Sequence, residues 1–341
     1  MSQDKFGVDG PYFDELAVGD AVRAPAYTLT SGRAAVHHAI LGGRLALSVD
    51  ADLARAVTGR ELADPAFVWD AAIGQSTAFT RRVIANLFYR GLALHRLPAI
   101  GDTLHTRTEV VGLRQTSSRP AGLAALRVQT HDQNGLLVLD FVRCAMLPLS
   151  APEVRTGHAM DLSQLGPAEL ADTAGQLTSG WDTRQLPAEQ FSAGQLSPGD
   201  SWQLQAGDVV SSAPELARLT LNLAHVHHDR FASPSGRLVY GGHTIGLALA
   251  HIARAVPQLL TVTGWTRCDH TGPVREGDTL YSQITLTSVR PGPGSLVRLG
   301  LHVIVRAGRD RAQPDPSQPS VEAGPALQDV LDWELTALAL A

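Results

Sequence analysis

The feature that most constrains the fold is an internal repeat. Three short segments recur in the same order: LAVGDAV (16–22) as QLSPGDSW (195–202), IGDTLHT (100–106) as EGDTLYS (276–282), and VLDFVRCAML (138–147) as VLDWELTALA (330–339). The offsets are close to one another, at 180, 176 and 192 residues. Matches in one order at nearly one offset predict a duplication, so the chain should fold as two similar units.

Each copy combines strand and helix patterns. From 297 to 305 every second residue is Val or Leu, the period of a strand with one covered face. From 244 to 256 apolar residues recur with helical spacing, Gly241 and Gly242 precede the run, and Pro257 ends it. Because the other face of this helix is also apolar, protein must surround it.

These patterns predict an α+β fold in which a long antiparallel sheet curves around a central apolar helix, and in which two copies share one continuous sheet. We place the units at 10–150 and 191–341. The stretch 151–190, rich in Gly, Ser, Thr and Pro, is expected to link them, and 311–324, with three prolines, is expected to form a loop between the last two strands.

Composition excludes several classes of protein. The net charge is -5 and there is no dense Lys/Arg run, which argues against nucleic-acid binding. No apolar stretch is long enough to span a membrane and no secretory signal is visible, so we expect a cytoplasmic protein. Cys144 and Cys268 lie outside any metal-binding spacing, and no metal is expected. Charged residues make up 18%, below the usual ~25%, which predicts extensive packing and a homo-oligomer.

A polar cluster distinguishes the second copy from the first. The run NLAHVHHD (222–229) places an amide, three imidazoles and a carboxylate in eight residues of an otherwise apolar stretch. Subtracting 180 sets Gly42 opposite Asn222 and Leu47 opposite His227, so the first copy has lost these groups at that offset. We therefore expect one active site per chain, in the second unit, with the first unit shaping the pocket.

NLAHVHHD, followed by LVYGGHTIGLALA, resembles the signature of the MaoC-type (R)-specific enoyl-CoA hydratases and dehydratases, which have the hotdog fold. Other segments resemble a two-hotdog subgroup, that of the mesaconyl-CoA hydratases or β-methylmalyl-CoA dehydratases: PYFDELAVGD, LGGRLAL, NLFYRG, VYGGHTIGLA and both GDTL turns. The resemblance implies a double hotdog and a hydro-lyase that reversibly hydrates a short branched dicarboxylic enoyl-CoA. It implies an acyl-CoA substrate and no further cofactor.

The resemblance also assigns roles to residues. His227 and Asn222 take the catalytic positions and Asp229 supports the motif. Gly242 and His243, at the helix start, take the place that binds the thioester oxygen, because unpaired N–H groups there favour negative charge.

In the first copy four residues are candidates to contact CoA or an acid group of the substrate: Tyr89, Arg90, His95 and Arg96. For each of these, an ordinary surface contact is the alternative interpretation.

One residue departs from the single-domain pattern. Those hydratases have Asp where this chain has Asn222, and an amide cannot accept a proton. His227 would then transfer the proton alone or with a substrate carboxylate. A general (R)-specific enoyl-CoA hydratase, a hotdog thioesterase and a non-catalytic acyl-CoA-binding protein stay open as alternatives. The thioesterase is disfavoured because the hydratase-like segment precedes the central helix.

Overall fold

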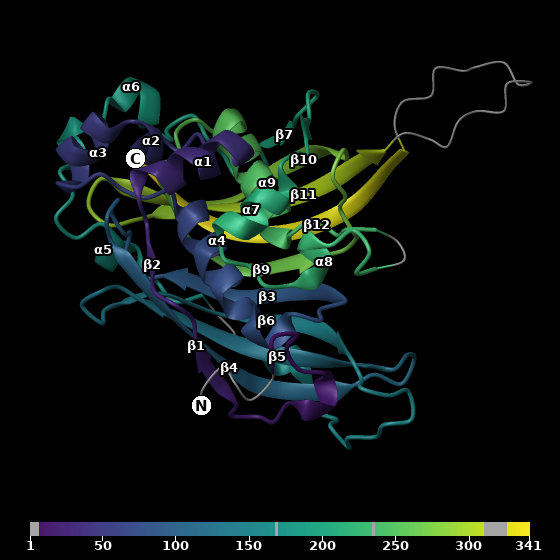
Figure 1. Cartoon of the computed structure of the whole chain (residues 1–341). Coiled ribbons are helices and arrows are strands. Elements are labelled where there is room, and N and C mark those ends of the chain that lie inside the picture. Colours follow the sequence, from purple (N-terminus) through teal and green to yellow (C-terminus); the bar gives the residue numbers. More distant parts are fainter. Residues whose placement is uncertain (1–6, 168–169, 234–235, 310–325) are drawn as a thin grey trace, which may run out of the picture.

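The computed structural model describes residues 7–167, 170–233, 236–309 and 326–341. Within them, one large antiparallel sheet runs through the whole molecule in the order β1-β4-β5-β6-β3-β9-β12-β11-β10-β7, with β2 paired to β4 and β8 paired to β10 (Figure 1). The strands of the first half are β1 Ala21–Arg23, β2 Tyr27–Thr28, β3 Ala85–Leu94, β4 Thr103–Gln115, β5 Ala121–His131 and β6 Leu137–Pro148. Those of the second half are β7 Ser201–Gln203, β8 Asp208–Val209, β9 Thr261–His270, β10 Thr279–Pro291, β11 Leu296–Arg309 and β12 Ala326–Leu340.

The sheet is symmetric about the pair β3 and β9. Each half has the same order outward from this seam, so β6, β5 and β4 of the first half correspond to β12, β11 and β10 of the second. At the seam Leu92 pairs with Trp265 and Tyr89 pairs with Cys268. The duplication therefore appears as two antiparallel units joined edge to edge, as expected of a double hotdog.

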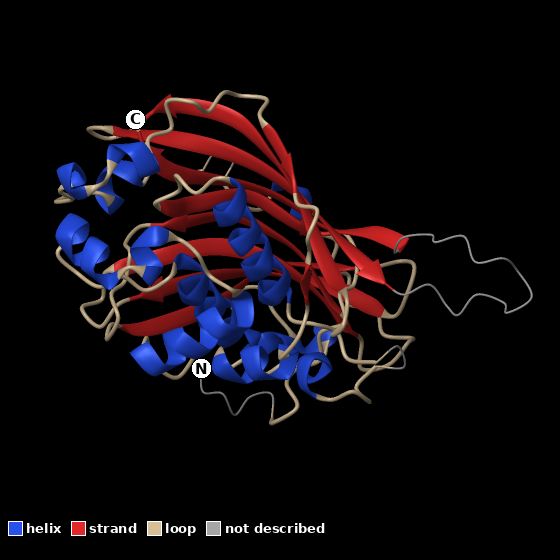
Figure 2. Cartoon of the chain, turned by 90° about the horizontal axis from the view of Figure 1, so that it is seen from above, coloured by secondary structure: helices blue, strands red, loops and turns tan. Residues whose placement is uncertain are grey.

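Helices cover one face of the curved sheet (Figure 2). They are α1 Ser31–Leu41, α2 Ala46–Val49, α3 Ala51–Thr58, α4 Pro65–Gln75, α5 Ala174–Leu177, α6 Ala188–Phe191, α7 Ala213–Leu219, α8 His225–His228 and α9 Gly241–Ala255. Every residue of α4 is buried, as are nearly all of α9, which makes them the two central helices. Pro257, which cannot continue a helix, lies two residues beyond α9. No helix of the described residues is long and apolar enough to cross a membrane.

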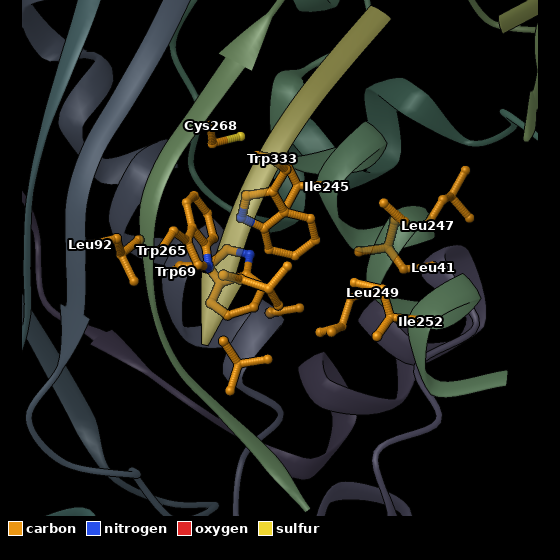
Figure 3. Close-up of a cluster of buried hydrophobic side chains, with 14 of the residues drawn as sticks. Leu41, Trp69, Leu92, Ile245, Leu247, Leu249, Ile252, Trp265, Cys268 and Trp333 are labelled. Atoms are coloured by element: carbon orange, nitrogen blue, oxygen red, sulfur yellow. The ribbon is translucent and has the colours of Figure 1, made fainter. Parts of the chain in front are cut away.

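The two units share one hydrophobic core. Trp69 of α4, Trp265 of β9 and Trp333 of β12 meet edge to face, with ring centroids 4.8 to 6.4 Å apart, and Ile245 of α9 lies in the same cluster (Figure 3). Side chains of both halves fill this space, so removing either half would expose a large apolar surface. The first unit thus supports the second through a shared core.

The segment 151–190 packs against the sheet where glycines leave room for it. Leu162 and Leu165 approach Gly112 so closely that an added Cβ would lie 2.8 and 2.9 Å from them, and Pro167 would lie 2.3 Å from a Cβ on Gly91. The expected linker therefore packs against the sheet and is not a segment without contacts. The loop expected at 311–324 lies outside the described residues.

Candidate active site

A cavity of about 370 Å³ lies between the two units. The second unit contributes the start of α9, the end of β9 and the segment around α8, while the first unit contributes β3, Arg143 of β6 and the residues after α4. Most of its lining is apolar, with a few convergent polar groups, as is usual for sites that bind small molecules.

His227, on the short helix α8, lines this cavity. Its Nδ1 lies 2.9 Å from the carbonyl oxygen of Leu238, so Nδ1–H donates there and Nε2 keeps its lone pair. Burial lowers the pKa of His227 to about 4, so the ring is neutral near pH 7. A neutral imidazole with one fixed N–H and one free lone pair can act as a general base.

Asn222 lines the same cavity and is 4% exposed. Its Oδ1 accepts from the backbone N–H of Ala224 at 2.9 Å, while its Nδ2 is buried without a partner among the described residues. The backbone carbonyl of Asn222 accepts from Nε2 of His228 at 2.7 Å. The amide N–H groups of Asn222 are therefore unpaired among the described residues, and its side-chain oxygen is already engaged. His228 therefore stabilises the loop that contains Asn222.

The start of α9 borders the cavity through Gly241 and Thr244. The first N–H groups of a helix lack the usual partner one turn back, and the helix dipole favours negative charge beside them. In α9 the N–H of His243 already donates to the Tyr240 carbonyl at 2.9 Å, so it is not free for a ligand. Gly242 and His243, named from the sequence, are not among the described lining residues. A Cβ on Gly242 would lie 2.1 Å from Oδ1 of Asp70. Gly242 thus lets the two central helices meet, and Gly241 is the glycine of this turn that lines the cavity.

His243 is fully buried, and neither ring nitrogen has a partner in the described part of the chain. Burial lowers its pKa to about 4. Tyr240, the residue before α9, does line the cavity, and its hydroxyl donates to the backbone oxygen of Asp70 at 3.1 Å. Its ring centroid lies 5.8 Å from that of His227. Asp70 of the first unit therefore positions Tyr240, which lines the cavity.

Arg143 was missed by sequence reasoning. It is 3% exposed, lines the cavity, and donates only to uncharged groups, namely Asn86 Oδ1 (3.2 Å), the Ser76 carbonyl (3.2 Å) and Thr80 Oγ1 (2.7 Å). Its Nε is buried without a partner in the described structure. No aspartate or glutamate occurs among the described lining residues, whereas Arg275 is a second lining arginine. The cavity is therefore suited to an anionic ligand.

His270, at the end of β9, was also missed. It lines the cavity, and its buried Nε2 lacks a partner among the described residues. Burial lowers its pKa to about 4. A Cβ on Gly241 would lie 2.6 Å from this nitrogen, so the imidazole touches the start of α9. Its nearness is one of the causes that lower the pKa of His227.

The other sequence candidates are dispersed. Tyr89 lines the cavity beside His270. Arg90 pairs with Asp269, Arg96 with Asp132 (3.4 Å), and neither they nor His95 belong to the described lining. Asp229 accepts from the backbone N–H of Phe231 at 2.8 Å and so shapes the loop after α8.

The start of α4, which is the first unit's equivalent of the start of α9, already binds a carboxylate of the chain itself. Asp64 stands before α4 where Tyr240 stands before α9, and its Oδ1 accepts from the Ala66 N–H at 2.7 Å. This carboxylate therefore binds one N–H group of the first turn of α4, and Pro65, the first residue of the helix, has no N–H to offer. Leu47, opposite His227, is buried in an apolar cluster.

The first copy has nevertheless kept polar groups that the 180-residue offset does not find. His38 pairs with Asp64 at 3.3 Å and His37 with Asp70 at 2.9 Å. These pairs lie on α1, α4 and just before α4, and not at Gly42 and Leu47, which the 180-residue offset places opposite Asn222 and His227.

Comparison with known proteins identifies the class. No family model matches the sequence. A double-hotdog protein of Mycobacterium tuberculosis, described as conserved, hypothetical and essential for survival during infection, is 48% identical over 98% of this chain and 99% of its own, with a TM-score of 0.83. A MaoC domain dehydratase of Chloroflexus aurantiacus is 24% identical, covers 97% of both chains and has a TM-score of 0.82, a likeness of fold.

Two curated relatives are more specific in name. β-Methylmalyl-CoA dehydratase of Chloroflexus aurantiacus is 26% identical over 96% of this chain and 97% of the relative. Mesaconyl-CoA hydratase of Cereibacter sphaeroides is 28% identical over 84% and 87%. The chain belongs to the two-hotdog subgroup of the MaoC-type hydratases and dehydratases, which are hydro-lyases.

Proposed function

We propose that this protein reversibly hydrates a short branched dicarboxylic enoyl-CoA, with mesaconyl-CoA as the leading substrate. The observation that carries the proposal is Arg143, a buried cation in a cavity whose described lining has no acid. An uncompensated buried charge is costly, and a substrate carboxylate would pair with it. The forked guanidinium is suited to binding a carboxylate through two N–H groups. The names of the two curated relatives support the same substrate class.

The proposed chemistry uses His227 as base and then as acid. In hydration, Nε2 of His227 takes a proton from water while the oxygen bonds to Cβ of the enoyl group. The π electrons move toward the thioester, where N–H groups at the start of α9 stabilise the enolate oxygen. The imidazolium then returns its proton to Cα. Dehydration follows the reverse path, and neither direction needs a redox cofactor.

Asn222 has a defined place in this scheme. Its free Nδ2–H can donate to the attacking water and leave the lone pair of the oxygen directed at Cβ. An aspartate there would add a negative charge to a cavity that must also hold the substrate's own carboxylate. The amide therefore fits a dicarboxylic substrate better than an acid does.

The test is an assay of the purified protein with mesaconyl-CoA, crotonyl-CoA and itaconyl-CoA, following loss of the conjugated thioester and identifying products by mass. Of the three thioesters, we expect mesaconyl-CoA to have the highest kcat/KM. A preference for crotonyl-CoA would indicate a general enoyl-CoA hydratase instead. Release of free CoA would indicate a thioesterase, and tight binding without turnover would indicate a binding protein.

A further inference from the structure

His270 has a ring nitrogen without a hydrogen-bond partner among the described residues, beside the start of α9. Its Nε2 is buried, lacks a hydrogen-bond partner among the described residues, and lies against Gly241 in the first turn of α9. Buried polar atoms are normally satisfied within a protein, so an orphaned imidazole nitrogen in a cavity calls for a ligand. Tyr89 packs against the ring with centroids 5.8 Å apart and fixes it from the side of β3.

We propose that His270 is a further catalytic residue, whose Nε2–H donates to the thioester oxygen together with the first-turn N–H groups of α9. This inference rests on the proposed function. In the reaction His270 keeps its proton throughout. As the water oxygen bonds to Cβ, the π electrons move onto the thioester oxygen, and the hydrogen bond from His270 strengthens.

The contacts of His227 and His270 suit them to different roles, His227 to that of a base and His270 to that of a hydrogen-bond donor. His227 has its Nδ1–H fixed on the Leu238 carbonyl and presents a lone pair, as a base requires. His270 lies at the helix start, where the N–H dipoles favour an anion and would repel a cation. A neutral imidazole is the better partner there, because it can donate without first losing a proton to the enolate.

The first unit offers no equivalent. In the seam-symmetric arrangement β3 corresponds to β9, and Leu94 ends β3 where His270 ends β9. Leu94 is fully buried in the core. The first unit therefore lacks this donor as well as the open helix start, which agrees with one reactive centre per chain.

The decisive variants are His270→Leu and His270→Gln. Removing one oxyanion donor costs ~100- to 1,000-fold in kcat in other enzymes, so His270→Leu should lower kcat by about that factor with a small change in KM. His270→Gln keeps an N–H donor and should recover part of the loss. Gly241→Ala should act like His270→Leu, because its Cβ would meet Nε2 at 2.6 Å and displace the ring.

His251→Gln is the matched control. His251 lies on α9 and is fully buried, whereas His270 is partly buried; His251 binds Ser282 (2.7 Å) and Asp208 (2.8 Å), outside the described cavity lining. It should lower thermal stability and leave kcat within about threefold of the parent. Equal kcat losses for His251→Gln and His270→Leu would overturn the proposal, as would full activity of His270→Leu.

A measurement without turnover separates this inference from the proposed function. The saturated thioester [1-13C]butyryl-CoA should show a downfield carbonyl 13C shift when bound, because the donors polarise the C=O bond. The shift should shrink in His270→Leu and stay in His251→Gln. An unchanged shift in His270→Leu would overturn the assignment. If the parent hydrates none of the three enoyl-CoA substrates, the proposed function fails, while this shift still reports on His270.

Discussion

Arg143 gives the sharpest prediction about substrate choice. In Arg143→Met the charge is lost and a similar volume of side chain is kept. A carboxylate about 4 Å from a guanidinium, at an effective dielectric constant of about 20, interacts by about 4 kcal/mol. Since 1.4 kcal/mol is about tenfold, kcat/KM for mesaconyl-CoA should fall by ~100- to 1,000-fold, whereas crotonyl-CoA, which lacks the acid, should change by less than about threefold.

Stability should respond much less than specificity. The substitution removes three hydrogen bonds, each worth about 1 to 2 kcal/mol, and it also removes the several kcal/mol that burying the cation costs. These contributions oppose each other, so the free energy of unfolding should change by less than about 2 kcal/mol.

Steady-state kinetics on both thioesters, with urea unfolding, measure the two effects of Arg143→Met. Arg127→Met, on β5 and paired with Asp140 at a half-exposed site, is the matched control. Arg143→Lys keeps the charge without the fork and should fall between the parent and Met. Equal losses on both substrates, or an unchanged ratio, would refute the assignment of Arg143 to the substrate acid.

Three further outcomes follow from the same site. Asn222→Asp should shift the kcat/KM ratio toward crotonyl-CoA, because its carboxylate repels a substrate acid and raises the pKa of His227; an unchanged ratio would place the acid group elsewhere. Desolvation lowers the pKa values of His227, His243 and His270 to about 4, against 6.5 when unfolded, so the unfolded chain binds more protons between those values. The free energy of unfolding should therefore be highest above pH 6.5 and decrease toward pH 4, by roughly 3 kcal/mol for each imidazole. A free energy of unfolding that denaturant titrations find unchanged from pH 7 to 5 would contradict this. Because Asp64 fills the first helix start, calorimetry should show one acyl-CoA per chain, and two equivalent sites would contradict the asymmetry.

Much of the fold could be predicted from the sequence because repetition and periodicity are properties of the chain itself. The GD and GDTL turns revealed the duplication, the alternation at 297–305 revealed β11, and the apolar run at 244–256 revealed α9. The pattern also located His227 and Asn222, since they lie in one short run of eight residues. The size of the linker's contact with the sheet could not be predicted, because it depends on glycines of distant strands.

The rest of the site depends on contacts between elements that are far apart in the chain. On β6, Arg143 lies on the same face as the buried Leu139 and Phe141, because side chains two residues apart on a strand point the same way. A charged residue at such a position is a sequence signal for a buried polar site. His270 carries no such signal, because nothing near it in the sequence says that β9 ends at the start of α9. The contact of Gly242 with Asp70 likewise joins the two units, and it leaves Gly241 as the cavity-lining glycine of α9.

The most direct test of the central claim compares His227→Gln with Asn222→Ala on mesaconyl-CoA. If His227 alone transfers the proton, His227→Gln should lower kcat by ~100-fold or more, and Asn222→Ala should cost less because it removes only the orientation of water. Circular dichroism and acyl-CoA binding of both variants should match the parent. Turnover by His227→Gln within about tenfold of the parent, or a greater loss in Asn222→Ala, would contradict the claim that His227 is the acid–base residue of this site.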